Sequence, residues 1–345
     1  MPRKPERIRV EIGTGPSTAP EIEEPAGPVR VLVVGPFAGS GGGRLARPIA
    51  VNRDSFDEVL ARVAPELRIP HPAGSGELAL RFRSLEDFHP DLLRHHCERA
   101  APAGSLLDAI ASGSELSGPT LEASVRAILH QPALQALEAA WNGLLFLLRR
   151  VEPLYVLDAT REGLGAALRG LSGQWDLIVA DFLYGDAESD RLELEEAAAA
   201  AKGLGARLVT GAAVPMAGRG GAVLAYPRFL LRLPYGEGGA TVDSFDFEEC
   251  PGAPEAGHLL WGNPGFAIAA VLAGGEGVEG RSLDITDGPA YVYRREGEPA
   301  LLAATEHVLS PADAEEWLAR GLSVLLWYRS RATVRAVAAD FSSLD

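Results

Sequence analysis

The sequence predicts a mixed α/β (α+β) fold, with a partly parallel sheet flanked by helices, and three observations support this. Residues 29–34 are apolar apart from Arg30, and a run of this kind is typical of a strand buried on both faces. Between residues 154 and 214, strand-like and helix-like segments alternate, as they do in parallel sheets with connecting helices. Hydrophobic residues make up 47% of the 345 residues and charged residues 23%, so the chain can bury a sizeable core.

The N-terminal elements that we expect are short. Residues 7–13 alternate like a strand that needs a partner, and residues 16–28 read as an extended linker. The segment 52–67 has helical spacing, with Asn52 or Asp54 as its cap and Pro65 at its end. Further expected elements are strands at 47–51 and 77–84 and a short helix within 85–98.

The C-terminal elements are longer and more regular. A helix is expected at 121–130, and a second one begins at Pro132 and carries Trp141 on a broad apolar face. The alternating part then gives strands at 154–159, 175–182 and 206–214 and helices at 161–171 and 191–204. After a Gly- and Pro-rich stretch at 215–257, we expect a short apolar helix interrupted near Pro264, strands around a turn in 282–298, a helix capped by Ser310, and strands at 322–330 and 333–341.

Charge and cysteine content restrict the class of protein. The net charge of −15 disfavours nucleic acid and anionic membranes as partners. Cys97 and Cys250 lie far apart without CxxC spacing, so the sequence supports neither a disulfide framework nor a zinc site, and two free thiols fit a reducing cytoplasm. With no apolar signal segment at the N-terminus and no apolar run of about eighteen residues, we expect a cytoplasmic protein without membrane insertion.

The loop Gly39–Gly43 follows an apolar strand, as a phosphate-binding loop does. That motif requires a lysine and then a hydroxyl residue, and here Arg44 and Leu45 stand in their places. A strand follows the loop, whereas a phosphate site needs the N-terminus of a helix. The sequence therefore predicts a surface turn with no cofactor.

Acidic side chains at strand ends give an alternative hypothesis. Asp158, Asp181 and Asp186 lie at or after two predicted strands, where open α/β sheets place their sites, so a paired-carboxylate or metal site is one interpretation and helix capping another. The adjacent His95, His96 and Cys97 point in different directions on a helix and cannot all bind one ion without ligands from elsewhere. We therefore predict no catalytic residue, cofactor or metal site, and an α/β nucleotide-binding enzyme is the alternative.

Several motifs resemble a known pair of families. "VLVVGPFAG", "NRDSFDEVL" and "FRSLEDFHPD" are similar to the small sheath subunit of bacterial type VI secretion systems (TssB or VipA), over about residues 7–93. "ILHQPALQALEAAWNGLLFLLRR", "PRFLLRLPYG", "FDFEE" and "HLLWGNPGFAIAAVLA" are similar to the large sheath subunit (TssC or VipB), over about residues 121–329. The chain therefore resembles a natural fusion of two subunits in their usual interacting order.

This resemblance implies a division of the chain and a structural function. Residues 1–28 would be a flexible arm with a short strand, 29–98 a small-subunit-like domain, 99–119 a linker, and 120–345 a truncated large-subunit-like domain. Small and large sheath subunits form a heterodimer that stacks into a helical contractile tube around an inner tube, and added strands tie neighbouring units together. The protein would be a structural component and not an enzyme.

The resemblance also implies partners. These are further sheath subunits, an Hcp-like inner-tube protein and a baseplate, whereas the segment that engages the ClpV disassembly ATPase is not evident in the sequence. A non-polymerising sheath or baseplate adaptor is the alternative within this class. The candidate subunit-interface residues come from two sources. Arg7, Ile8, Arg9 and Val10 lie in the short strand that we expect to be exchanged with a neighbour. Phe82, Phe88, Trp141, Arg232 and Trp261 are candidates because Arg and aromatic side chains are favoured at interfaces, and the core is the alternative for Trp141 and Trp261.

Overall fold

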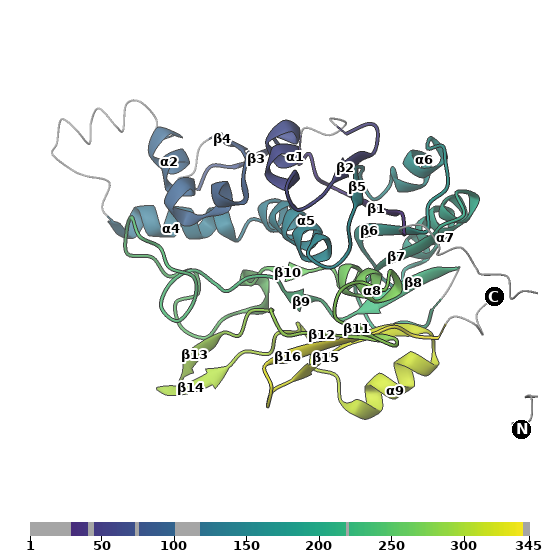
Figure 1. Cartoon of the computed structure of the whole chain (residues 1–345). Coiled ribbons are helices and arrows are strands. Elements are labelled where there is room, and N and C mark those ends of the chain that lie inside the picture. The colour runs from purple at the N-terminus through teal and green to yellow at the C-terminus, as the bar shows by residue number, and fades with distance from the viewer. Residues whose placement is uncertain (1–28, 41–44, 73–75, 101–117, 219–220, 341–345) are drawn as a thin grey trace, which may run out of the picture.

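The computed structural model describes residues 29–40, 45–72, 76–100, 118–218 and 221–340 (Figure 1). The predicted N-terminal strand at 7–13, the linker at 16–28 and most of the predicted linker at 99–119 lie outside these residues. None of the helices in the described part of the chain is long and apolar enough to cross a membrane.

A large mixed sheet runs through the described part of the chain (Figure 1). From edge to edge its strands are β11 (Val278–Glu279), β12 (Ser282–Ile285), β16 (Thr333–Val337), β15 (Leu322–Tyr328), β8 (Ala222–Tyr226), β7 (Arg207–Ala212), β6 (Leu177–Tyr184), β1 (Val31–Gly35), β5 (Leu154–Asp158) and β2 (Ile49–Val51). The strands from β15 to β5 run parallel, and the outer strands β2, β16, β12 and β11 each pair antiparallel. This confirms the predicted α/β class.

Strand β1 lies between β5 and β6 and is buried on both faces. Val31 and Val33 face one part of the hydrophobic core, and Leu32 and Val34 face the other. Its unbroken apolar run is explained by this position, because successive side chains of a strand point to opposite faces. The predicted buried strand is therefore confirmed, and it comes from residues 29–98 although its neighbours come from residues 120–345.

Helices cover both faces of the sheet. On one face, α5 (Pro132–Leu148) and α8 (Pro264–Leu272) share a core with Val31 and Val33. On the other face, residues of α6 (Leu164–Arg169) and α7 (Glu188–Gly203) share a second core with Leu32 and Val34, and Trp317 of α9 (Pro311–Ala319) packs against this core. Both helices predicted from βα alternation are therefore present; α6 is shorter than the predicted 161–171, and α7 begins three residues before the predicted 191–204.

The remaining N-terminal elements pack on the α5 side. They are α1 (Phe56–Val63), the hairpin of β3 (Glu66–Pro70) and β4 (Glu77–Arg81), the 3₁₀ turn η1 (Leu85–Phe88), α2 (Pro90–Ala100) and α4 (Gly118–Leu129). The predicted helix at 52–67 is too long at both ends. Ser55 occupies the cap position, and Ala64 in a left-handed conformation (φ 44°) ends the helix before β3.

The Gly- and Pro-rich stretch at 215–257 contains more structure than its composition predicts. It holds the central strand β8, the short β9 (Phe229–Leu230) and the beginning of η2 (Ala256–His258). Strand β9 pairs with β10 (Trp261–Gly262), and α8 begins at Pro264 and is not interrupted there. The strands predicted around one turn separate, because β12 joins the large sheet whereas β13 (Val292–Arg295) and β14 (Glu298–Leu301) form their own hairpin.

Candidate assembly interface

Trp141 joins the two halves of the predicted fusion. It lies on α5 with no exposed surface, and its indole N–H donates to the carbonyl oxygen of Phe37 at 3.2 Å. The rings of Phe37 and Phe56 meet it edge-on, with centroids at 5.2 and 5.8 Å. Edge-on aromatic pairs each contribute about 0.5–1.5 kcal/mol beyond burial, so Trp141 fixes residues 29–98 onto α5.

Phe82 and Phe88 form a second aromatic contact. Each is 1% exposed, and their rings stack with centroids 4.1 Å apart and planes 7° apart. Both lie within residues 29–98, one after β4 and the other in η1. This contact holds the hairpin against the 3₁₀ turn.

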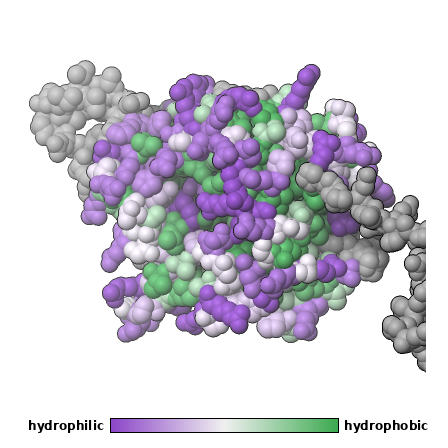
Figure 2. All heavy atoms as spheres, in the orientation of Figure 1, coloured by the Kyte–Doolittle hydropathy of each residue, from purple (hydrophilic) through white to green (hydrophobic). Residues whose placement is uncertain are grey.

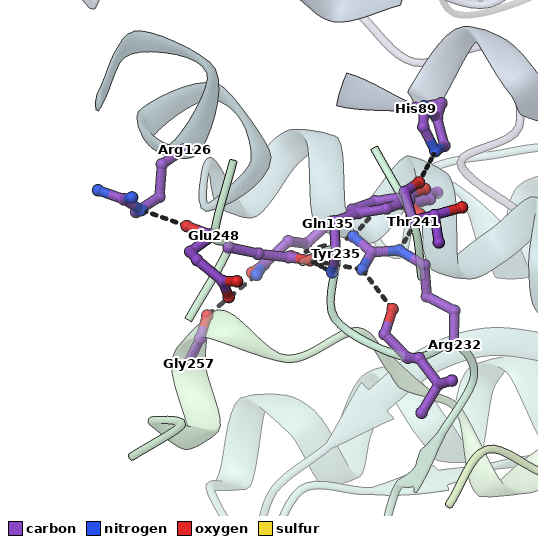
Figure 3. Close-up of polar contacts among 11 residues, drawn as sticks. His89, Arg126, Gln135, Arg232, Tyr235, Thr241, Glu248 and Gly257 are labelled. Atoms are coloured by element: carbon purple, nitrogen blue, oxygen red, sulfur yellow. Dashed lines mark hydrogen bonds and ion pairs between the residues drawn. The ribbon is translucent and has the colours of Figure 1, made fainter. Parts of the chain in front are cut away.

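A long irregular segment, residues 231–260, connects β9 to β10 and receives side chains from several elements (Figure 3). Arg126 of α4 donates from Nε to the carbonyl oxygen of Glu248 at 2.8 Å, and Gln135 of α5 donates from Nε2 to that of Gly257 at 3.0 Å. These bonds satisfy backbone carbonyls that no sheet partner reaches. We call residues 231–260 the connecting segment.

The first turn of helix α2 binds the connecting segment through Asp91. The carboxylate of Asp91 accepts from the backbone N–H of Asp243 at 3.1 Å, from the N–H of Ser244 at 2.9 Å, and from the Ser244 hydroxyl. Burial raises the pKa of Asp91, but the hydrogen bonds from Ser244 and Asp243 outweigh it and hold the pKa below its ordinary value. Asp91 therefore binds the segment in its ionised form.

His89 and Arg94 extend the same contact. His89 donates from Nε2 to the carbonyl oxygen of Thr241 at 3.0 Å, and its ring meets Tyr235 edge-on with centroids 4.7 Å apart. Its Nδ1 accepts from the N–H of Asp91 at 3.3 Å, which fits the neutral Nε2–H tautomer. Arg94 donates to the carbonyl oxygen of Ser244 at 3.2 Å. The motif "FHPD" thus supplies anchors that sequence reasoning did not single out; the acidic residue in the first turn of a helix was the available signal.

Arg232 of the connecting segment is the centre of a buried charge cluster. Its guanidinium pairs with Glu138 of α5 at 2.5 Å and with Glu249 at 2.8 Å, and the two glutamate side chains are 2% and 1% exposed. Glu249 also accepts from the N–H of Tyr235 at 2.8 Å, and the Tyr235 ring lies 4.2 Å from the guanidinium. Burial lowers the pKa of Arg232, but the two carboxylates outweigh it and keep the guanidinium charged.

Trp261 is the last predicted interface residue within the described chain. It is 7% exposed, and its indole N–H donates to the carbonyl oxygen of Ala256 at 2.7 Å. Phe82, Phe88, Trp141, Arg232 and Trp261 therefore make their observed contacts inside the chain. Their role between subunits stays a prediction, and Arg7, Ile8, Arg9 and Val10 lie outside the described residues.

The glycine loop after β1 has a structural explanation where it is described. A side chain at Gly39 (φ +67°) would meet the carbonyl oxygen of Glu66 at 2.5 Å, and the N–H of Ser40 donates to that oxygen at 2.7 Å. Glycine is thus required by the close approach of β3. The rest of the loop lies outside the described residues.

Two of the strand-end acids, Asp158 and Asp186, have different partners. Asp158 accepts from the N–H of Ala38 at 2.8 Å, and Asp186 pairs with Arg191 at 2.5 Å. In the ranges that the structure describes, no three His, Cys, Asp or Glu side chains are arranged to hold a metal ion. Asp158 and Asp186 therefore fix the local backbone and helix α7, and Asp181 stands in β6, on the other side of β1 from Asp158.

Hydrophilic and hydrophobic residues are interspersed over the face drawn in Figure 2.

The outer strands of the large sheet are short: β11 has two residues and β2 three. Short edge strands limit unspecific strand addition.

Comparison with family models matches two parts of the chain. Residues 3–132 match the family described as "Type VI secretion system, VipA, VC_A0107 or Hcp2", and residues 222–275 match "VipB: EvpB/VC_A0108, tail sheath N-terminal domain". No curated protein matches the chain. The VipA match continues past residue 98 through the predicted linker and α4.

The two matched parts contact each other in the structure. His89, Asp91, Arg94 and Arg126 lie in the VipA match, and the backbone groups that they bind at 241–248 lie in the VipB match. The matched families are those of structural sheath proteins. Residues 3–132 are thus similar to the small-subunit family of the type VI secretion tail sheath, and residues 222–275 of the same polypeptide are similar to the large-subunit family.

Proposed function

We propose that the chain is a structural subunit of a type VI secretion contractile sheath and that it assembles into a helical tube around an Hcp-like inner tube. One observation supports this proposal above all: side chains of the residues that match VipA hydrogen-bond to the connecting segment, which lies within the residues that match VipB. Both matched parts also contribute strands to the large sheet. One folded chain would then hold what a small and a large subunit supply together.

The division into regions is part of this proposal. Residues 29–98 supply β1 and β2, and residues 120–345 supply the other strands of the large sheet. We propose residues 1–28 as the arm that exchanges a strand with a neighbouring unit, because strand addition gains main-chain hydrogen bonds without any catalytic residue. Repeating such a head-to-tail contact without closure produces a helical polymer. The chain would act in the cytoplasm and would not be an enzyme.

Electron microscopy of the purified chain, alone and mixed with an Hcp-like inner-tube protein, tests the proposal. We expect rings or tubes in at least one sample, and none from a variant that lacks residues 1–28. Circular dichroism of that variant is the control for folding. Dispersed particles in all samples would contradict the proposal and favour a non-polymerising adaptor.

A further inference from the structure

A pocket of about 350 Å³ opens at the carboxyl ends of β1 and β6. Pro36, Arg161, Asp181, Arg228, Trp261 and Asn263 are among the residues that line it. The strand order reverses at this point, because β5 lies on one side of β1 and β6 on the other. Ligands of open α/β sheets bind in the crevice at such a reversal, and the volume falls in the range of small-ligand sites, about 300–1,000 Å³.

The backbone at this pocket has a specific irregularity. The pairing of β6 with β7 shifts register between Ala180 and Leu183, so Asp181 stands in a bulge of a central strand. The carbonyl oxygens of Ala180 and Phe182 accept from the hydroxyl of Thr210, both at 2.9 Å. Bulges of this kind re-aim side chains next to functional sites.

Buried polar groups support the bulge from two further sides. Asn263, which is 6% exposed, donates from Nδ2 to the carbonyl oxygen of Phe182 at 2.8 Å and hydrogen-bonds the carboxyl group of Asp181. A side chain at Gly35 would come within 2.9 Å of Cβ of Asp181, so a glycine in β1 leaves the space that Asp181 occupies. The carboxyl group is therefore held in place on both sides.

The positive charges of both arginines in the pocket are already balanced by ion pairs with carboxylates. Arg161 donates to Glu193 at 2.8 Å and to the carbonyl oxygen of Leu183 at 3.1 Å, and it pairs with Asp190 at 2.5 Å. Arg228 binds Glu306 through two bonds of 2.7 and 2.5 Å. Their donors are thus engaged by three carboxylates.

Asp181 is the remaining ionisable group of the pocket wall, and no ion pair joins it to a cation among the described residues. Burial raises the pKa of Asp181 to about 7, although the hydrogen bond with Asn263 lowers it. Asp190, Glu193 and Glu306, which lie behind Arg161 and Arg228 and outside the pocket lining, already outnumber these two guanidinium groups. The ionised Asp181 therefore adds a negative charge to the wall that neither arginine balances. The pocket is complementary to a cation.

We propose that this pocket binds the cationic end of a ligand, a primary ammonium or guanidinium group on an apolar stem, with the carboxylate of Asp181 as its counter-ion. Pro36, Trp261 and the α5 residues Ala136 and Ala139 offer the apolar wall for the stem. Such a group can belong to a free small amine or to a lysine or arginine side chain of a second copy of this chain. The proposal goes beyond sheath assembly and does not require a polymer.

Calorimetric titration of the full chain with agmatine, at about 0.15 M salt and pH 8, tests the proposal. We expect saturable binding at one site, weakened at least about tenfold in Asp181→Asn and unchanged in Glu195→Gln, an exposed acid of α7 outside the pocket. Wild-type binding should also weaken at least about tenfold at pH 5.5, because Asp181 is then protonated. Absent binding, or equal binding by Asp181→Asn, overturns the proposal.

A second variant guards against a folding defect in Asp181→Asn. Ala139→Leu keeps the carboxylate but fills the pocket from α5, and it should abolish agmatine binding while retaining the wild-type circular dichroism spectrum. Unchanged binding in this variant would place agmatine elsewhere and refute the proposal.

Sedimentation velocity distinguishes the two sources of the cation. If agmatine and Asp181→Asn both reduce self-association, the occupant is a side chain of a second copy. If self-association is unchanged while agmatine still binds, the occupant is a free amine. Because agmatine binding is measured on dispersed chain, it remains interpretable even where the sheath proposal fails.

Discussion

At the residue scale, the cluster of Arg232, Glu138 and Glu249 ties the connecting segment to α5. One guanidinium is shared by two carboxylates in a place that water barely reaches. Burial raises the pKa of Glu138, against the attraction of Arg232 that lowers it. The cluster is stable only as a whole, because removing the cation leaves two buried carboxylates without compensation.

Replacing Arg232 by methionine should therefore lower the free energy of unfolding by about 3–5 kcal/mol at pH 7. The matched control is Arg335→Met, since Arg335 pairs with Asp284 at 2.6 Å but both side chains are more than a third exposed. That change should cost about 0–1 kcal/mol. Urea unfolding followed by circular dichroism measures both, and equal effects of the two substitutions would contradict this account.

Asp91 provides the second prediction at this scale. Asp91→Ala removes the acceptor of two backbone N–H groups in the connecting segment and should lower the free energy of unfolding by about 1–3 kcal/mol. Hydrogen exchange at Asp243 and Ser244 should become faster. Asp54→Ala, at an exposed position, is the control and should leave both measurements nearly unchanged.

The effect of Asp91 depends on pH. Its pKa is lower in the folded protein than in the unfolded chain, so its contribution is present above the unfolded value of about 4 and is lost as the pH falls through the folded value. The stability difference between wild type and Asp91→Ala should therefore shrink below about pH 4. A difference that grows on acidification would show that another group is responsible.

At the element scale, α5 and α8 approach closely where α5 carries Gly143. A Cβ atom at this position would lie 2.3 Å from the ring of Phe266, which is fully buried on α8. The contact allows both helices to lie on one face of the sheet. Trp141, two residues earlier on α5, then reaches Phe37.

Gly143→Ala should lower the free energy of unfolding by about 1–3 kcal/mol through overpacking. Gly203→Ala is the matched control at the end of α7, where nothing lies within 4 Å of the added methyl group. It should raise the free energy by about 0.4–1 kcal/mol. Combining Gly143→Ala with Phe266→Leu should recover part of the loss, and strict additivity in this thermal-unfolding cycle would refute the contact.

The elements that sequence could predict are those with strong local patterns. The apolar run of β1, the broad apolar face of α5 and the Ser310 cap of α9 are all confirmed, because each depends on neighbouring residues. Strand β8 was missed because five apolar residues between glycines and a proline give too short a pattern. Strand β3 was not predicted, because it begins only two residues after the left-handed Ala64 and the helical segment considered, 52–67, runs into its first two residues.

The candidate site could be predicted only in part, for a related reason. Arg and aromatic residues were predicted as subunit-interface residues, but sequence does not show whether such a side chain faces a second chain or a distant part of its own chain. Trp141 and Phe37 are 104 positions apart, and Asp91 and Ser244 are 153 apart. Contacts over such separations are decided by the topology of the sheet and leave no local pattern.

At the scale of the whole molecule, the two parts of the chain that match family models contribute strands to one sheet. Strand β1 from residues 29–98 hydrogen-bonds β5 on one side and β6 on the other. Residues 120–345 without β1 would expose the inner edges of both strands. Unpaired buried strand edges promote aggregation.

Dividing the chain within residues 101–117 therefore gives a clear expectation. The C-terminal fragment alone should be insoluble or aggregated, and coexpression with the N-terminal fragment should restore a soluble complex that co-purifies. The control introduces a cleavable site at the same place in the intact chain, where cutting after folding should leave the complex together. A soluble, folded C-terminal fragment with the wild-type circular dichroism per residue would contradict this prediction.

The central position of β1 has a kinetic consequence. If one chain had to supply the middle strand of a sheet in a second chain, folding would be a second-order reaction. The yield of the folded complex would then depend on the concentrations of both chains. In one polypeptide, the same strand meets its neighbours within its own chain, at an effective concentration that does not depend on how much protein is present. Refolding of this protein should accordingly be first order, at a rate that dilution does not change.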